Sequence, residues 1–170
     1  MPLADTLLRL GSRLGLYQPK WTSQIIVEVN RSLCLDFGLT GVQLERRESE
    51  MRSNLPYAWV EGYEDLIFSM TNHPKDRHVL AAAVRCEAKA IVTHNLKDFP
   101  RSALDQHAII ALGPSEFLRE MYYLNPQFVS KTLHLQAASI NQPIDYILDR
   151  LNVNAPGFVS FLRSKRFSES

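Results

Sequence analysis

Apolar side chains recur at helical spacing over most of this chain, and short apolar runs interrupt that pattern. Spacings of three and four residues between apolar positions place one side of a helix inward. Glycines mark two of the expected helix ends, at Gly15 and Gly38, because glycine readily adopts the left-handed conformation that closes a helix. On this basis, helices are predicted over residues 1–15, 22–37, 40–53, 64–70 and 77–88, and from residue 114 onward.

Two short apolar runs are predicted to be strands, Ala90–Thr93 and Ala108–Ala111. The first directly follows a helix, and an almost wholly apolar run in that position suits a parallel sheet buried on both faces. A third segment, Tyr57–Tyr63, is rich in β-forming residues and is predicted to be a short strand or an extended connection. The middle of the chain therefore alternates helix, strand, helix, strand, helix, which is the order of a three-layer α/β fold.

The chain changes in character after residue 124. Three further helices are predicted over 127–140, 143–151 and 155–166, and prolines at 126, 143 and 156 separate them. We therefore expect an α/β domain over residues 1–124 and a helical extension over residues 125–170. This extension is either a cap on the sheet or a small appended subdomain.

Composition and charge limit the possible functions only loosely. The chain has 170 residues, of which 45% are hydrophobic and 22% charged, as in ordinary globular proteins. A net charge of +1 gives no global field that favours nucleic acid, although a local basic patch would be hidden in that sum. No stretch approaches the roughly 20 apolar residues of a membrane span, and the N-terminus lacks a signal pattern. We expect a cytoplasmic protein without a membrane partner.

Candidate chemistry is concentrated in the stretch from Asn72 to Pro100. Asp76 lies at the predicted start of a helix, while Asn95 and Asp98 follow the first predicted strand. Open α/β sheets place their sites at the carboxyl ends of parallel strands, so these side chains could converge. Carboxylate and amide oxygens are ligands that Mg²⁺ and Mn²⁺ accept. The stretch therefore predicts a site for a hard divalent cation.

Charged residues outside this stretch allow two interpretations. Residues 40–53 carry Arg46, Arg47 and Arg52 among several glutamates. They form either a solvated helix face with pairs four residues apart or a set of phosphate contacts. Glu28 lies beside the apolar face of its predicted helix and, taken alone, is a solvated carboxylate.

Two segments with their spacing resemble PIN-domain proteins, in particular VapC-like toxins and their bacterial relatives. The first is Asp76–Ala83 (DRHVLAAA), and the second is Ile91–Pro100 (IVTHNLKDFP). The similarity extends to Trp21–Glu28, which resembles the family helix that brings an acidic residue to the site. It also includes Pro114–Leu118, which resembles the proline-led helix after the last strand. The resemblance covers roughly residues 3–124.

The resemblance implies a ribonuclease that uses Mg²⁺ or Mn²⁺ held by acidic side chains. In this family Glu28 and Asp76 match acidic site positions, and Thr93 would position a carboxylate or the water. Asn95 stands where many relatives have the next acid, and Asp98 follows shortly after; either could face the metal. The family also implies an RNA substrate, an antitoxin partner and a homodimer.

The start of the chain differs from the family pattern. Family members begin with an apolar strand that ends in the first site aspartate, whereas Met1–Leu8 resembles the helix that follows it. Asp5 lies on that helix and is not assigned to the missing position. We therefore expect a PIN-like fold that lacks its N-terminal strand and first aspartate. Three accounts stay open: a start codon placed too late, a truncated inactive relative, or a partner that supplies the strand at an exposed sheet edge.

These observations leave three functional hypotheses. The first is a metal-dependent endoribonuclease of PIN type, which could be the toxin of a toxin–antitoxin pair. The second is a catalytically impaired PIN scaffold that binds RNA or a protein partner without cleavage; the missing aspartate and the amide of Asn95 favour it. In the third, Asp76 and Asp98 only stabilise a helix start and a turn, as aspartates often do.

Overall fold

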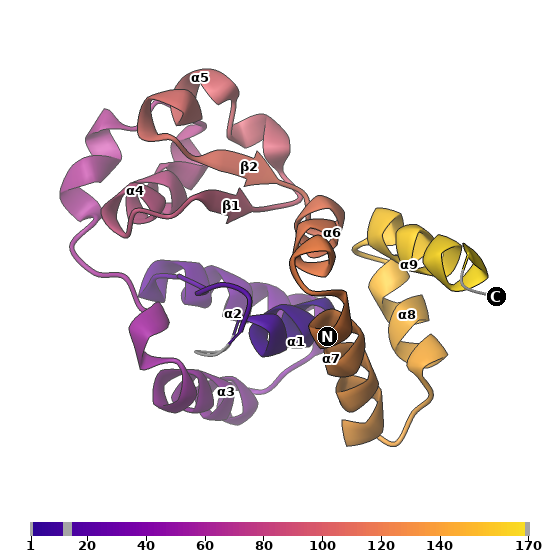
Figure 1. Cartoon of the computed structure of the whole chain (residues 1–170). Coiled ribbons are helices and arrows are strands. Elements are labelled where there is room, and N and C mark those ends of the chain that lie inside the picture. Colours follow the sequence, from indigo (N-terminus) through magenta and orange to yellow (C-terminus); the bar gives the residue numbers. More distant parts are fainter. Residues whose placement is uncertain (1, 12–14, 169–170) are drawn as a thin grey trace. The chain divides into compact units, whose positions relative to one another are not determined.

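The computed structural model describes residues 2–11 and 15–168 and is mostly helical (Figure 1). The α-helices in chain order are α1 (Pro2–Leu10), α2 (Ser23–Phe37), α3 (Gly41–Asn54), α4 (Arg77–Arg85), α5 (Arg101–Leu104), α6 (Pro114–Leu124), α7 (Pro126–Ser139), α8 (Ile144–Asn152) and α9 (Pro156–Ser168). Short 3₁₀ helices are η1 (Pro56–Ala58), η2 (Glu64–Ser69), η3 (Pro74–Asp76), η4 (Leu96–Asp98) and η5 (Asp105–His107). The strands are β1 (Ala90–Val92) and β2 (Ile110–Leu112).

The chain forms two compact units, each with its own apolar core. The central unit contains Pro19–Ile91 and Lys97–Ala111. The C-terminal unit contains Met1–Gln18, Val92–Leu96 and Leu112–Ser170.

Strands β1 and β2 pair in parallel, which the hydrogen bonds from Ile110 N to Lys89 O (3.1 Å) and from Thr93 N to Leu112 O (3.0 Å) define. The predicted α/β class is therefore confirmed. The expectation of a strand buried on both faces is wrong: Ile91 is buried, but Val92 is 36% and Ile110 is 55% exposed. Among the described residues the sheet has two strands, too few for helices to enclose both faces.

The central unit begins with the helix that the apolar pattern predicts. The Thr22 hydroxyl caps α2 by accepting a hydrogen bond from Ile25 N at 3.1 Å, and Gly38 closes the helix with φ of 66°. The segment after η1 is the predicted extended connection, and its Trp59 forms a parallel bridge with Trp21. The core gathers α4 with the segments around both strands; its fully or nearly fully buried members include Leu80, Ala81, Ile91, Phe99, Leu104 and Ile109.

The C-terminal unit confirms the three helices predicted after residue 124. Helix α1 packs against α7 and α8, while α6 contacts α7 and α9 (Figure 1). A buried hydrogen bond of 2.7 Å from the Thr6 hydroxyl to Gln136 Oε1 fixes α1 on α7. Helix α1 ends at Leu10, so the predicted end at Gly15 is wrong; Gly11 follows directly and has low helix propensity. Leu14 of the predicted helix is outside the described residues, and the predicted domain boundary at residue 124 stays a prediction.

No helix in the described part of the chain is both long enough and apolar enough to cross a membrane.

Candidate functional site

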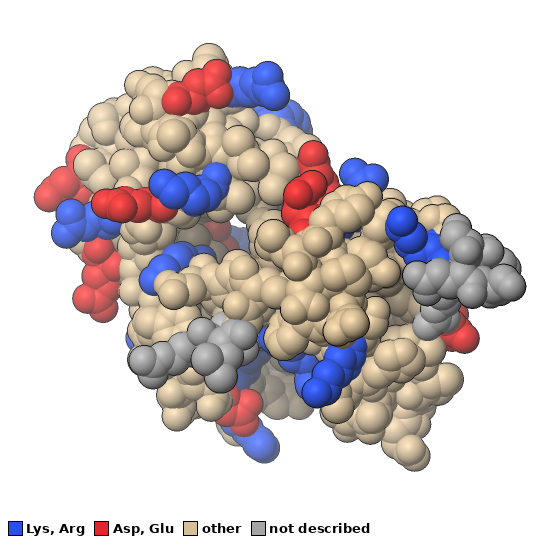
Figure 2. Space-filling model, in the orientation of Figure 1, with Lys and Arg blue, Asp and Glu red and all other residues tan. Residues whose placement is uncertain are grey.

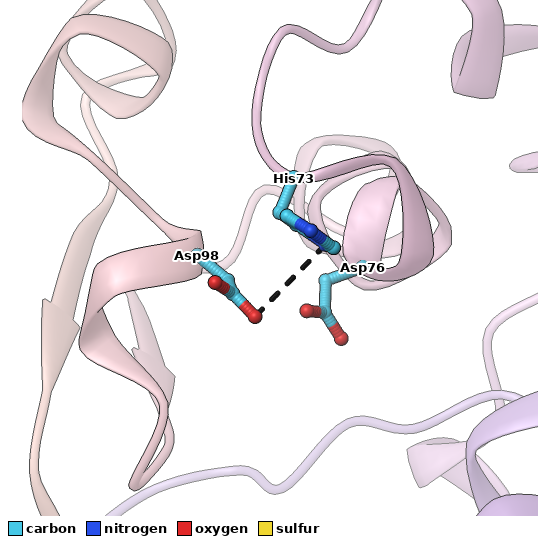
Figure 3. Close-up of side chains that lie close together, drawn as sticks. All are labelled: His73, Asp76 and Asp98. Carbon is cyan, nitrogen blue, oxygen red and sulfur yellow. Dashed lines mark ion pairs between the residues drawn. The ribbon is translucent and has the colours of Figure 1, made fainter.

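Three side chains with metal-binding chemistry meet in the central unit: His73, Asp76 and Asp98 (Figure 3). One possible ligand atom from each lies within 4.8 Å of the others. His73 directly precedes η3 and Asp76 ends it, whereas Asp98 ends η4, 25 positions after His73 in sequence. The fold therefore brings together two of the carboxylates predicted for the site, Asp76 and Asp98.

The backbone holds these two segments in position. The His73 N–H donates to the Asp98 carbonyl at 3.1 Å, and the Asp76 N–H donates to the His73 carbonyl at 2.9 Å. The side chains are further apart than the backbones, since His73 Nδ1 lies 4.0 Å from Asp98 Oδ2. A distance of 4.0 Å is too long for a direct hydrogen bond.

The electrostatics of the cluster disfavour two ionised carboxylates. Burial raises the pKa of the Asp76 carboxyl above its ordinary value, and the hydrogen bond and the charge of Asp98 raise it further. His78 and His73 act in the opposite direction and lower this pKa. The net shift is upward, so burial and Asp98 together outweigh the two histidines.

Glu28, on α2 of the same unit, contacts a buried histidine, His78. Glu28 Oε1 lies 3.3 Å from His78 Nε2, and the Glu28 side chain is 55% exposed while that of His78 is 5% exposed. The contact lacks hydrogen-bond geometry, so the buried Nε2 has no hydrogen-bond partner among the described residues. His78 also lowers the pKa of the Asp76 carboxyl, so this one histidine interacts with two predicted site acids, Glu28 and Asp76.

Thr93 and Asn95 lie in the turn that leaves β1. The Asn95 N–H donates to the Thr93 hydroxyl oxygen at 3.0 Å, a local bond that stabilises the turn. Both belong to the C-terminal unit, and their assignment to the site stays a prediction.

The three arginines predicted as possible RNA contacts all have protein partners. Arg46 pairs with Glu50 and Arg52 with Glu48, each at 2.9 Å and four residues apart. Arg52 also lies over the Trp59 ring, with its guanidinium carbon 3.7 Å from the ring centroid. Burial lowers the pKa of the Arg47 guanidinium, which donates to Asn30 Oδ1 at 3.4 Å.

Pairs four residues apart are what the interpretation as a solvated helix face predicts. RNA contact by the arginines stays a prediction. Acidic and basic side chains are interspersed over the face shown in Figure 2, as the net charge of +1 suggests.

Sequence reasoning missed both histidines, His73 and His78. Each is inside the stretch already singled out, three residues before and two residues after Asp76. Attention to histidine as a ligand near a predicted acid could have found His73. The burial of His78 could not be read from the apolar pattern, which counts histidine as polar.

The donor set fits a divalent cation. Two carboxylates and one imidazole within 4.8 Å offer both oxygen and nitrogen ligands, and a cation would offset the burial of the Asp76 carboxyl and its repulsion by Asp98, which raise its pKa. Glu28 of α2 is not among the residues whose ligand atoms lie within 4.8 Å of one another, and its place in the site stays a prediction.

Comparison with known proteins gives one informative relative. No family model matches the chain, and no solved structure matches it. A protein of Mycobacterium tuberculosis (strain ATCC 25618 / H37Rv), named "Putative ribonuclease VapC50", is 43% identical over 114 residues, which cover 65% of this chain and 68% of the relative. Identity at this level over two thirds of a curated protein, together with the α/β fold, establishes the relationship. The chain belongs to the VapC-like family of PIN-domain proteins.

Proposed function

We propose that this protein is a metal-dependent endoribonuclease of PIN type. The observation that carries the proposal is the convergence of Asp76, Asp98 and His73, with ligand atoms within 4.8 Å of one another. The name of the mycobacterial relative, a ribonuclease, supports RNA as the substrate. The resemblance stated for residues 76–83 and 91–100 supports the same activity.

The residues of the central unit have distinct roles in this proposal. Asp76 and Asp98 hold Mg²⁺ or Mn²⁺, and Glu28 adds a third carboxylate that His78 orients. When bound, such a cation supplies an activated water and offsets charge on the scissile phosphate. The raised pKa of Asp76 fits this role, because a cation favours the ionised carboxylate that the metal-free site disfavours.

Other predicted residues take supporting roles. Thr93 and Asn95 position the water or add an amide oxygen ligand at the end of β1. Arg46, Arg47 and Arg52 contact RNA phosphates after exchanging their present partners. The family implies an antitoxin partner, a homodimer and a cytoplasmic location, and we include these in the proposal.

RNA cleavage in the presence of Mn²⁺ tests the activity. The unmutated protein should cleave single-stranded RNA, EDTA should stop cleavage, and Asp76→Asn should lower the rate by about 100-fold or more, because it removes a ligand carboxylate. Asp65→Asn is the matched control, since Asp65 is an exposed aspartate of the same unit outside the cluster. Absence of cleavage by folded unmutated protein, or equal rates for Asp76→Asn, would refute the proposal.

A second candidate is a PIN scaffold that binds RNA or a protein without cutting. The amide of Asn95, at a position where relatives carry an acid, favours it, because an amide adds no negative charge to the site. Gel-shift measurement with the same RNA separates the two functions. Binding without cleavage supports the scaffold, whereas cleavage that depends on Asp76 excludes it.

A further inference from the structure

We propose that His73 supplies a nitrogen ligand to the metal centre and thereby makes the site selective for Mn²⁺ over Mg²⁺. This inference rests on the proposed metal site and identifies which ion it prefers. It concerns a side chain that the motif positions at residues 28, 76, 95 and 98 do not include.

The position of His73 is fixed by its backbone. Its N–H donates to the Asp98 carbonyl at 3.1 Å and its carbonyl accepts from the Asp76 N–H at 2.9 Å. Pro74 follows, and its ring disfavours helical conformation at the preceding residue; His73 accordingly has φ of −54° and ψ of 132°. The imidazole is thus presented beside both carboxylates by bonds that do not depend on the side chain itself (Figure 3).

The distances leave room for a shared ion. Two ligands at ~2.1 Å from one cation lie ~3 Å apart when adjacent and ~4.2 Å apart when opposite. The 4.0 Å between His73 Nδ1 and Asp98 Oδ2 falls in this interval. The widest separation in the cluster is at most 4.8 Å, and a small side-chain rotation would bring it into the same interval. A direct hydrogen bond between His73 and Asp98 would instead bring the two atoms to about 3 Å.

The same unit also holds a buried polar group whose hydrogen bonding is incomplete. His78 is 4% exposed, and its Nε2 has no hydrogen-bond partner among the described residues. Glu28 Oε1 lies 3.3 Å from this atom without hydrogen-bond geometry, and the Glu28 side chain is 55% exposed. Buried polar atoms normally have a hydrogen-bond partner. A fixed Glu28 carboxylate would provide one for His78, and such bonds typically orient the ligands of a metal site.

The chemistry of the donor atoms gives the selectivity. Imidazole nitrogen binds first-row transition metals well, whereas Mg²⁺ prefers oxygen ligands and retains several waters. A site of carboxylates alone discriminates weakly between Mg²⁺ and Mn²⁺. Adding His73 strengthens binding of Mn²⁺ and leaves that of Mg²⁺ nearly unchanged.

Calorimetric titration of metal-free protein with MnCl₂ and with MgCl₂ tests the inference without RNA. We expect the unmutated protein to bind Mn²⁺ at least about tenfold more tightly than Mg²⁺. His73→Ala should weaken Mn²⁺ binding by about 10–100-fold, the range seen when groups of a metal site are removed. The same variant should change Mg²⁺ affinity by less than about threefold. His134→Ala, which removes an exposed histidine on α7, is the matched control and should leave both affinities unchanged.

The outcomes separate this inference from the proposed function. Mn²⁺ affinity of His73→Ala within twofold of the unmutated protein refutes the nitrogen ligand, even if RNA is still cleaved. Equal loss of Mn²⁺ and Mg²⁺ binding also refutes it, because the histidine would then act only by supporting the loop. If Mn²⁺ binds through His73 but RNA is not cleaved, the inference stands and the endoribonuclease proposal fails.

Discussion

Replacing Asp76 by asparagine is expected to stabilise the metal-free protein while it destroys the proposed site. Burial and the neighbouring Asp98 both raise the pKa of the Asp76 carboxyl. Wherever the folded protein holds this group ionised, ionisation costs free energy that the unfolded chain does not spend. Asparagine keeps the size and the hydrogen-bonding oxygen of the side chain and removes the charge.

Repulsion by Asp98 adds to the cost of burying the Asp76 carboxylate, and its size follows from the separation of the two carboxylates. At the 4.8 Å limit of the cluster, two unit charges repel by roughly 1 kcal/mol in water and by 3–4 kcal/mol at an effective dielectric constant of about 20. The Asp98 side chain is 14% exposed and Asp76 is half-buried, so solvent screens part of the repulsion. We expect a gain of about 1–2 kcal/mol, or a rise in Tm of about 2–8 °C for a chain of this length.

The pH dependence has a definite sign. An aspartate whose pKa is raised by folding binds its proton more tightly in the folded protein than in the unfolded chain. Its unfavourable contribution is absent below the pKa of the unfolded aspartate, about 4, and is complete above the raised folded pKa. The Tm gain of Asp76→Asn should therefore be small near pH 4, grow as the pH rises through the folded pKa, and reach its full size above it.

Thermal unfolding in EDTA, followed by circular dichroism between pH 4 and pH 8, measures this gain. Asp98→Asn should give a similar gain, and the double variant should gain less than the sum, because either change removes the same repulsion. Asp65→Asn should stay within about 0.5 kcal/mol of the unmutated protein. A lower or unchanged Tm for Asp76→Asn at pH 7.5 would show that the two carboxylates do not repel in the metal-free protein, and would refute the reasoning.

Three further predictions concern neighbouring contacts. His78→Asn should weaken Mn²⁺ binding by about tenfold in calorimetric titration, and should add no further loss in a Glu28→Gln background, because both changes remove the same oriented carboxylate. Thr22→Ala should lower the free energy of unfolding in urea by about 1 kcal/mol through loss of the α2 cap. Arg52→Ala should cost about 0.5–1 kcal/mol in the same assay, since the guanidinium loses its position over Trp59.

The sequence predicts the ends of a helix well where the chemistry of a single side chain decides them. Gly38 ends α2 as predicted and Thr22 caps its start, because a hydroxyl cap and a left-handed glycine act within one helical turn. The burial of the strands could not be predicted in the same way. An apolar run indicates a strand, but the covering of its faces depends on how many strands join the sheet, and Ile110 is 55% exposed.

Helix α4 shows why the site was only partly predictable. The apolar pattern selects Val79, Leu80, Ala83 and Val84 as the inward face, whereas the buried residues are His78 and the run from Leu80 to Ala83. A helix that is buried almost all round carries no directional signal, because small alanines pack on every side. The carboxylates at residues 76 and 98 could be assigned by type and spacing, but the burial of His78 depends on tertiary packing.

His73 is the clearest case of a residue whose role depends on a long-range contact. In the sequence it is one polar residue before a proline, and the only signal of a role is its position three residues before the predicted site acid Asp76. It becomes significant because its N–H donates to the Asp98 carbonyl, which joins two segments 25 positions apart. This bond would place any side chain at residue 73 beside both aspartates. These backbone bonds do not themselves require a histidine, so we expect the role of residue 73 to lie in its imidazole nitrogen.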